Sequence, residues 1–311
     1  MVWAMLFGFG MNVLLQGLWH IPDVFSGIQP ISEKAVFFLR KRFPKQFEDN
    51  NRVGLLFTLF FLCCSVLLYM SVLMVCNSSP FLLFVMKVIM CYQLIASGFT
   101  CEESLRIHKA LRARDFWGAK KVALPIISST PWPEDDQFVI KVAIDKMVRS
   151  FGEGVIGLLF YMMIGDIWLA VPYAAINSIY WWMQNQQTTD IPQRSIISIL
   201  YSLLNFVPNY ITGWFSIVAL YALGMNGKAA RHTLAHHRSQ VLQLHPYRAL
   251  IACMGAMDNS ASARLLGNES EQPSGVKLWE TESQDILRTY YVMLTSSVIA
   301  LIVFSIIRLM V

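Results

Sequence analysis

The chain has 311 residues, of which 55% are hydrophobic and 14% are charged, and its mean hydropathy is +0.48. This balance lies outside the usual range of soluble globular domains and argues against an ordinary water-soluble enzyme or binding module. The formal net charge of +5 comes from basic residues spread over several segments without an aromatic-rich binding stripe, which predicts anionic lipid and not nucleic acid as the partner.

Five apolar segments predict membrane helices, since an α-helix needs roughly 20 apolar residues to cross about 30 Å of hydrocarbon. The first segment, residues 2–19, lacks the basic start and small-residue cleavage site of a secretory signal, so we expect a short first span. The other predicted spans are Val53 to Val75, Pro80 to Gly98, Ile196 to Ala222 and Thr289 to Ile307.

Basic residues predict the orientation, because Lys and Arg near the ends of spans tend to remain in the cytoplasm. Residues 19–52, 99–151 and 223–288 contain six, nine and seven of them, whereas residues 176–195 contain only Arg194. We therefore expect a multi-pass protein of the cell inner (plasma) membrane with its main loops in the cytoplasm. The segments 99–151 and 223–288 are then cytoplasmic helical loops.

Residues 154–182 allow two topologies. If they form one span, residues 176–195 lie outside the cell. If the chain turns at Gly165 and Asp166, the segment is a helical hairpin and Asn177 returns to the cytoplasmic side. Arg194 alone does not distinguish the two.

The run from residue 196 to 222 contains Pro208, which lacks an N–H group and therefore predicts a kink with one missing backbone hydrogen bond. Asn205 and Asn209 beside it are either functional or helix-packing residues, and the sequence leaves both open. The chain has no GxxxxGK[ST] or GxSxG motif. The predicted fold is an all-α polytopic membrane protein with five or six membrane segments, some kinked or hairpin-shaped, in one domain over residues 1–311.

Five motifs occur in a characteristic order: "LRIHKALRARDFWGAKKVALPIIS", "AIDKMVRSFGEGVIGLLFY", "PYAAINSIYWW", "LLNFVPNYITG" and "HPYRALIACMGAM". Between residues 99 and 267 their order and spacing resemble the membrane-embedded adenosylcobinamide-phosphate synthase family of cobalamin biosynthesis. The stretch "YWWMQNQQTTDIPQRSIISILYSLLNFVPNYITG" is also similar to an inner-membrane accessory protein of the same superfamily, which is linked to β-lactamase induction and cell-wall sensing.

The resemblance implies ATP-dependent amide formation between adenosylcobyric acid and aminopropanol or its phosphate. That activity is ligase-type, acts on a corrinoid substrate and uses ATP and Mg²⁺ as cofactors. Such a reaction needs acidic side chains that bind Mg²⁺ and basic side chains that neutralise the charge of the phosphate. The family pattern implies a hairpin turn at Gly165 and Asp166. Carried over residue by residue, it implies catalytic roles for Asp145, Glu153 and Asn177, and substrate binding by Ser178, Asn205 and His245.

Several charged residues of the family pattern are replaced in this chain. An Arg-Asp pair is replaced by Ser129 and Thr130, a Glu-Asn pair by Arg149 and Ser150, an Asp by Tyr180 and an Arg by Tyr210. Several of these replacements remove charge, which Mg²⁺ and phosphate handling require. Two functions therefore remain open: a divergent synthase with a reduced site, and a non-catalytic regulatory or sensory membrane protein of the accessory type, which needs no cofactor.

Overall fold

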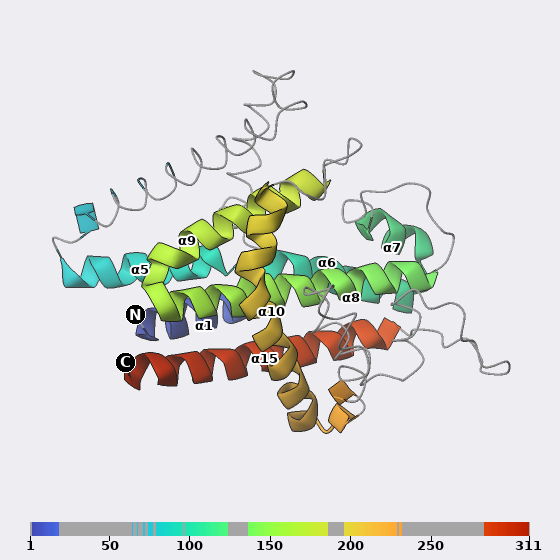
Figure 1. Ribbon diagram of the computed structural model, residues 1–311. Helices are drawn as coiled ribbons and strands as arrows, with labels where there is room; N and C mark the ends of the chain where they lie inside the picture. The colour runs from blue at the N-terminus through green and yellow to red at the C-terminus, as the bar shows by residue number, and fades with distance from the viewer. Residues whose placement is uncertain are drawn as a thin grey trace, which may run out of the picture. The chain divides into compact units, whose positions relative to one another are not determined.

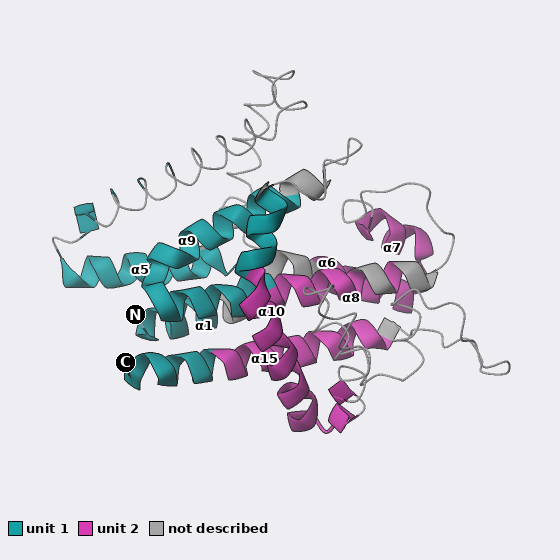
Figure 2. Ribbon diagram, viewed as in Figure 1, with its two compact units in different colours: residues 1–99, 153–204, 301–311 teal, residues 100–152, 205–300 magenta. Residues whose placement is uncertain are grey.

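The computed structural model describes residues 2–18, 79–95, 97–123, 136–185, 196–228, 230–231 and 283–310, together with residues 64, 67, 71 and 74–76. The regular structure of these residues consists of α-helices and one π-helix, without a β-strand (Figure 1). The all-α prediction is therefore confirmed for them. The chain divides into two compact units (Figure 2): unit 1 contains residues 1–99, 153–204 and 301–311, and unit 2 contains residues 100–152 and 205–300.

Among the described residues, three helical segments have the length and apolar composition of membrane spans: Ala143–Trp181, which is interrupted at Gly165 and Asp166, Ile197–Ala222 and Gln284–Met310. The second and third lie in α10 (Ile196–Ala222) and α15 (Ser283–Met310), so the last two predicted spans are confirmed as apolar helices. Together with shorter apolar helices, these segments make the protein polytopic and membrane-embedded. The predicted span from Val53 to Val75 falls mostly outside the described residues.

Two shorter apolar helices, α1 (Val2–Leu18) and α5 (Pro80–Leu94), pack against each other in unit 1. Gly8 allows this close approach, because a Cβ atom at that position would lie 2.6 Å from the Cβ of Cys91. The α5 helix ends at Leu94, before the predicted limit at Gly98, and its 15 residues cover roughly 22 Å. It is therefore shorter than the hydrocarbon core of a typical bilayer.

The segment that allowed two topologies is a helical hairpin. The π-helix η3 (Gly152–Gly157) leads into α9 (Leu158–Asn185), which is interrupted at Gly165 and Asp166. Asp166 has φ 59° and ψ −158°, which is not a helical conformation. Gly165 is required beside it, because a Cβ atom there would lie 2.4 Å from the Leu169 side chain.

Contacts between the two arms confirm that the chain reverses direction (Figure 1). The rings of Tyr161 and Tyr173 are 4.5 Å apart, whereas 12 residues of straight helix would separate them by about 18 Å. The indole nitrogen of Trp181 lies 2.8 Å from a carboxylate oxygen of Glu153. In a straight helix these two residues would be about 42 Å apart. The hairpin expected from the family resemblance is therefore correct.

Unit 2 contains α7 (Phe116–Ala123), α8 (Asp136–Phe151) and nearly all of α6 (Ser97–Arg112). The α6 and α8 helices are joined by a hydrogen bond of 3.2 Å from the Ser104 hydroxyl to the Ala143 carbonyl, and α7 packs on α8. The predicted loop 99–151 is thus helical where it is described. Most of the loop 223–288 lies outside the described residues, and the membrane side of both loops stays a prediction.

Candidate functional site

Glu153 is a buried acid in the π-helical turn that precedes the hairpin. The residue is 5% exposed, and η3 surrounds it with the glycines of the sequence "GEGVIG". A π-helical turn accommodates an additional residue compared with an α-helical turn, and such turns occur frequently at functional sites. Burial of a carboxylate is unfavourable unless hydrogen bonds replace its water.

Two side chains donate these hydrogen bonds to the Glu153 carboxylate. The indole N–H of Trp181, on the second hairpin arm, donates to Oε2 over 2.8 Å. The hydroxyl of Tyr201, in α10, donates to Oε1. Both carboxylate oxygens therefore accept from protein donors. Charge-assisted hydrogen bonds of this kind are stronger than neutral ones, so they hold the second arm and α10 to the π-helical turn.

Tyr173 connects Glu153 to Asn177. The Tyr173 hydroxyl donates to the backbone carbonyl of Glu153 over 3.2 Å, and its side chain is also hydrogen-bonded to that of Asn177. Tyr173 is 1% exposed and Asn177 is 8% exposed. The structure thus brings together two of the three residues for which the family resemblance implied a catalytic role.

An aromatic stack supports the Tyr201 hydroxyl. The rings of Tyr180 and Tyr201 lie 3.6 Å apart at 10°, and the Trp181 ring is perpendicular to that of Tyr201. We define the Glu153 cluster as Glu153, Tyr173, Asn177, Tyr180, Trp181 and Tyr201, all of which belong to unit 1. Tyr180 replaces an acid of the family pattern, so this replacement adds packing to the cluster.

The other predicted site residues, Asp145, Ser178, Asn205 and His245, do not belong to the Glu153 cluster. Asp145, in α8, accepts from Arg149 over 3.1 Å, and Asn205 is 1% exposed in α10. Both belong to unit 2. Ser178 is half-buried in α9 next to Asn177 in the sequence, and His245 lies outside the described residues.

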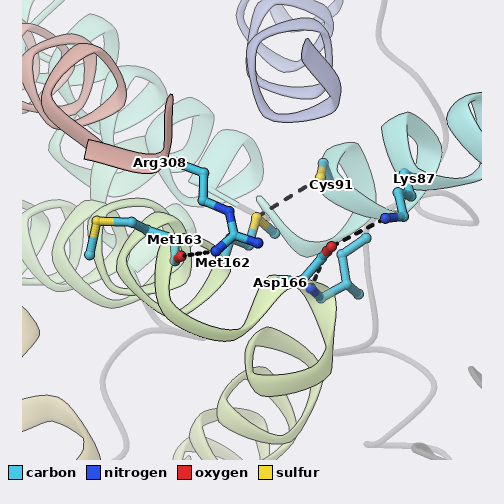
Figure 3. A network of polar contacts seen from close by, with 7 residues as sticks. Lys87, Cys91, Met162, Met163, Asp166 and Arg308 are labelled. Carbon is cyan, nitrogen blue, oxygen red and sulfur yellow. Dashed lines mark hydrogen bonds and ion pairs between the residues drawn. The ribbon is translucent and has the colours of Figure 1, made fainter. Parts of the chain in front are cut away.

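The tip of the hairpin carries a second polar network (Figure 3). The Lys87 ammonium of α5 pairs with Asp166 over 3.1 Å. The backbone N–H of Ile167 donates to the Asp166 side chain over 2.6 Å instead of continuing the helix. The Met163 carbonyl, which that N–H would bond in a regular helix, accepts from Arg308 over 3.2 Å. Two cations from different helices therefore stabilise the turn.

The proline in α10 is compensated by a tyrosine of the hairpin. Pro208 has no N–H group, so the carbonyl of Leu204 loses its usual helical partner. The Tyr161 hydroxyl donates to this carbonyl over 2.8 Å. The missing hydrogen bond that Pro208 predicted is thus provided by a side chain of the first hairpin arm.

The sequence profile of a family described as "CobD/Cbib protein" matches residues 29–242, more than half of the chain. The chain belongs to the CobD/Cbib family. Similar relatives are the cobalamin biosynthesis protein CobD of Clostridium perfringens, 23% identical over 278 residues with 87% of each chain covered, and that of Listeria monocytogenes, 22% identical over 225 residues with 70% covered. No solved structure matches this CobD/Cbib chain.

The residues that surround Glu153 in this CobD/Cbib protein were not predicted from the sequence. Tyr173, Trp181 and Tyr201 lie within the motifs "PYAAINSIYWW" and "ILYSLLNF", but their aromatic character is equally typical of membrane helices. The hydroxyl and indole N–H groups of these residues could have indicated a buried polar partner, because a buried Tyr or Trp usually forms a hydrogen bond. Among the described residues, no three His, Cys, Asp or Glu side chains are grouped closely enough to hold a metal ion.

Proposed function

We propose that this CobD/Cbib protein acts in cobalamin biosynthesis and forms the amide between adenosylcobyric acid and aminopropanol or its phosphate. Family membership and the printed names of the curated relatives support the pathway. The observation that carries the proposal is the link from Glu153 through Tyr173 to Asn177, because the family pattern implicates both ends of it.

ATP and Mg²⁺ are the cofactors that this activity implies. The two described acids of the proposed site do not fit a Mg²⁺ ligand pair. Asp145 is neutralised by Arg149 at 3.1 Å, and both carboxylate oxygens of buried Glu153 accept hydrogen bonds from side chains. Mg²⁺ favours carboxylates that keep room for water and substrate phosphates. Asp145 and Glu153 therefore do not hold a metal ion in the proposed reaction.

The proposed roles of the chain's own residues follow from this geometry. Glu153 acts as a positioning residue that orders the second hairpin arm, and Asn177 and Ser178 on that arm orient the substrates for amide formation. Asn205 and His245 complete the proposed substrate contacts. Orientation of an amine against an activated carboxyl group lowers the barrier by reducing the entropy lost in the reaction. The protein is proposed to lie in the inner membrane with these groups on the cytoplasmic side.

Two acids of the family pattern are replaced in this chain, and the contacts of the replacing residues favour a second function. Arg149 stands where the family has an acid and pairs with Asp145, and Tyr180 replaces another acid and stacks on Tyr201. Each replacement adds a contact within the chain and removes an acidic group of the kind that a site handling Mg²⁺ and phosphate requires. These observations support a non-catalytic regulatory or sensory membrane protein of the β-lactamase-induction accessory type.

Genetic complementation distinguishes the two functions. The gene is expressed in a strain that lacks its own adenosylcobinamide-phosphate synthase, on medium where growth depends on making cobalamin from adenosylcobyric acid. The proposed synthase restores growth, and Asn177→Ala abolishes it. Ser202→Ala, at an exposed position of α10, is the matched control and should retain growth. Membrane levels of all variants are measured by immunoblot.

Absence of growth with the unmodified chain at a normal membrane level would contradict the synthase and favour the regulatory protein. Growth that is unaffected by Asn177→Ala would retain the pathway but remove Asn177 from the site.

A further inference from the structure

The short helix α7 presents large apolar side chains on the face that points away from the protein. Trp117 is 84% exposed and Phe116 is 44% exposed, whereas Ala119 and Ala123 are buried. With 3.6 residues per turn, Ala119 and Ala123 lie about 200° and 240° around the helix from Trp117. The two alanines therefore form the packed side of α7, and Trp117 lies nearly opposite them.

Basic residues surround this outward face. Lys120 and Lys121 flank Trp117 at about −60° and 40° around the helix, and Lys121 is exposed. Arg112, the last residue of α6, and Arg114, in the turn before α7, are exposed as well. We define the α7 face as Arg112, Arg114, Phe116, Trp117, Lys120 and Lys121.

One acid lies among these residues, and its charge is used by the helix itself. Asp115 directly precedes α7, and its carboxylate accepts the backbone N–H of Gly118 over 2.8 Å. This is the geometry of a helix N-cap, in which a side chain satisfies a backbone donor that has no partner within the helix. The acid therefore stabilises the start of α7, and the α7 face keeps an excess of positive charge.

The turn before α7 fixes the direction in which Trp117 points. Arg114 adopts φ 59°, and the N–H of Asp115 bonds the Ala110 carbonyl over 2.9 Å. Gly118 is required, because a Cβ atom at that position would lie 2.2 Å from the Asp115 carboxylate. The exposed tryptophan thus belongs to a hydrogen-bonded turn and a packed helix.

We propose that the α7 face binds the surface of an anionic phospholipid membrane. Trp117 and Phe116 lie at the boundary between headgroups and acyl chains, and the four basic side chains contact lipid phosphates. Tryptophan is enriched at membrane interfaces, and each Lys or Arg near an anionic surface adds favourable binding energy. An eight-residue helix binds lipid weakly alone, but the membrane-spanning helices of the same chain keep it near the bilayer.

The charge of the α7 face favours lipid over a second protein as its occupant. The core of a protein interface is usually depleted of lysine, whereas long basic side chains around a tryptophan suit a headgroup layer, where their apolar stems cover hydrocarbon and their charges meet phosphate. This inference is independent of the proposed synthase, because no residue of the Glu153 cluster takes part in it.

Tryptophan quenching in the full-length protein tests the proposal. The chain is reconstituted in nanodiscs of phosphatidylcholine, with or without phosphatidylglycerol, that carry brominated acyl chains. The emission of Trp117 is obtained as the difference between the unmodified chain and Trp117→Phe, which preserves an aromatic residue. We expect brominated chains to quench this difference emission more strongly with phosphatidylglycerol than without it. Lys120→Gln with Lys121→Gln should remove the difference between the two lipids.

Trp168→Phe gives the control difference, since Trp168 lies just beyond the hairpin tip in an apolar helix and its quenching should not depend on lipid charge. Difference emission from Trp117 that is quenched by aqueous iodide, and not by brominated lipid, would overturn the proposal. Protection from iodide that increases with protein concentration would assign the face to a second copy of the chain and overturn it too.

Hydrogen exchange of the unmodified chain provides a second readout that needs no variant. Amide exchange of residues 112–123 should be slower in discs with phosphatidylglycerol than in discs of phosphatidylcholine alone. Equal exchange in both lipids would contradict recognition of anionic headgroups.

Discussion

The Tyr161 hydroxyl donates a hydrogen bond of 2.8 Å to the carbonyl of Leu204, four residues before Pro208. The two residues belong to different helices, and the bond replaces the one that the proline cannot make. It explains how an uncharged helix tolerates a proline at mid-length: the first hairpin arm satisfies the exposed carbonyl.

This relationship predicts a coupled effect of two substitutions. Tyr161→Phe should lower the free energy of unfolding by about 1 kcal/mol, because it leaves the Leu204 carbonyl without its donor. In a Pro208→Ala background the new backbone N–H can bond that carbonyl, so the same substitution should cost much less. Denaturant unfolding of the purified chain in detergent measures both. Equal costs in the two backgrounds would show that the Tyr161 bond does not compensate for the proline.

The ion pair at the hairpin tip predicts that neutralising one partner lowers the stability of the protein more than removing both partners does. The side chains of Lys87 and Asp166 are 24% and 22% exposed, so Lys87→Met leaves a poorly hydrated carboxylate and should cost about 1 to 3 kcal/mol. Adding Asp166→Gly removes that charge and relieves the positive φ, but it also removes the acceptor of the Ile167 N–H, so the double variant should recover part of the lost stability.

The measurement is the thermal unfolding midpoint in detergent. Lys109→Met, at an exposed position of α6, is the matched control and should leave the midpoint nearly unchanged. A double variant less stable than Lys87→Met alone would contradict the role assigned to the pair.

The Glu153 cluster predicts a loss of stability on Glu153→Gln. The amide nitrogen of glutamine cannot accept a hydrogen bond, so either Trp181 or Tyr201 loses its acceptor, at a cost of about 1 to 3 kcal/mol. Trp181→Phe removes one donor, so its cost and that of Glu153→Gln should be less than additive in the double variant. Additive costs in unfolding experiments would mean that the two side chains do not act as a pair.

Much of the fold could be predicted from apolar length and composition. The α10 helix and residues 289–307 of α15 are uncharged runs in the sequence, and the requirement to span hydrocarbon leaves few alternatives to a helix for such runs. The hairpin could be expected from a glycine next to an acid, Gly165 and Asp166, but periodicity alone allowed a single span. The packing of Tyr161 against Tyr173 determines the topology, and this contact depends on tertiary structure.

The candidate site was predictable only in part. Glu153 and Asn177 were identified through the family pattern, and Tyr173 connects them. The donors to the Glu153 carboxylate come from residues 28 and 48 positions later in the chain, and no local pattern encodes such pairings. The sequence shows that Asp145 is an acid, but it does not show that the side chain pairs with Arg149. This pairing determines what Asp145 can bind.

We propose amide-bond formation as the reaction of this CobD/Cbib protein. The most direct test incubates the purified chain in nanodiscs with adenosylcobyric acid, aminopropanol or its phosphate, ATP and Mg²⁺, and analyses the corrinoids by mass spectrometry. We expect an ATP-dependent product whose mass equals that of both substrates less one water. Absence of this product from a folded chain, while an active synthase tested in parallel forms it, would contradict amide formation by this protein and leave the non-catalytic regulatory function.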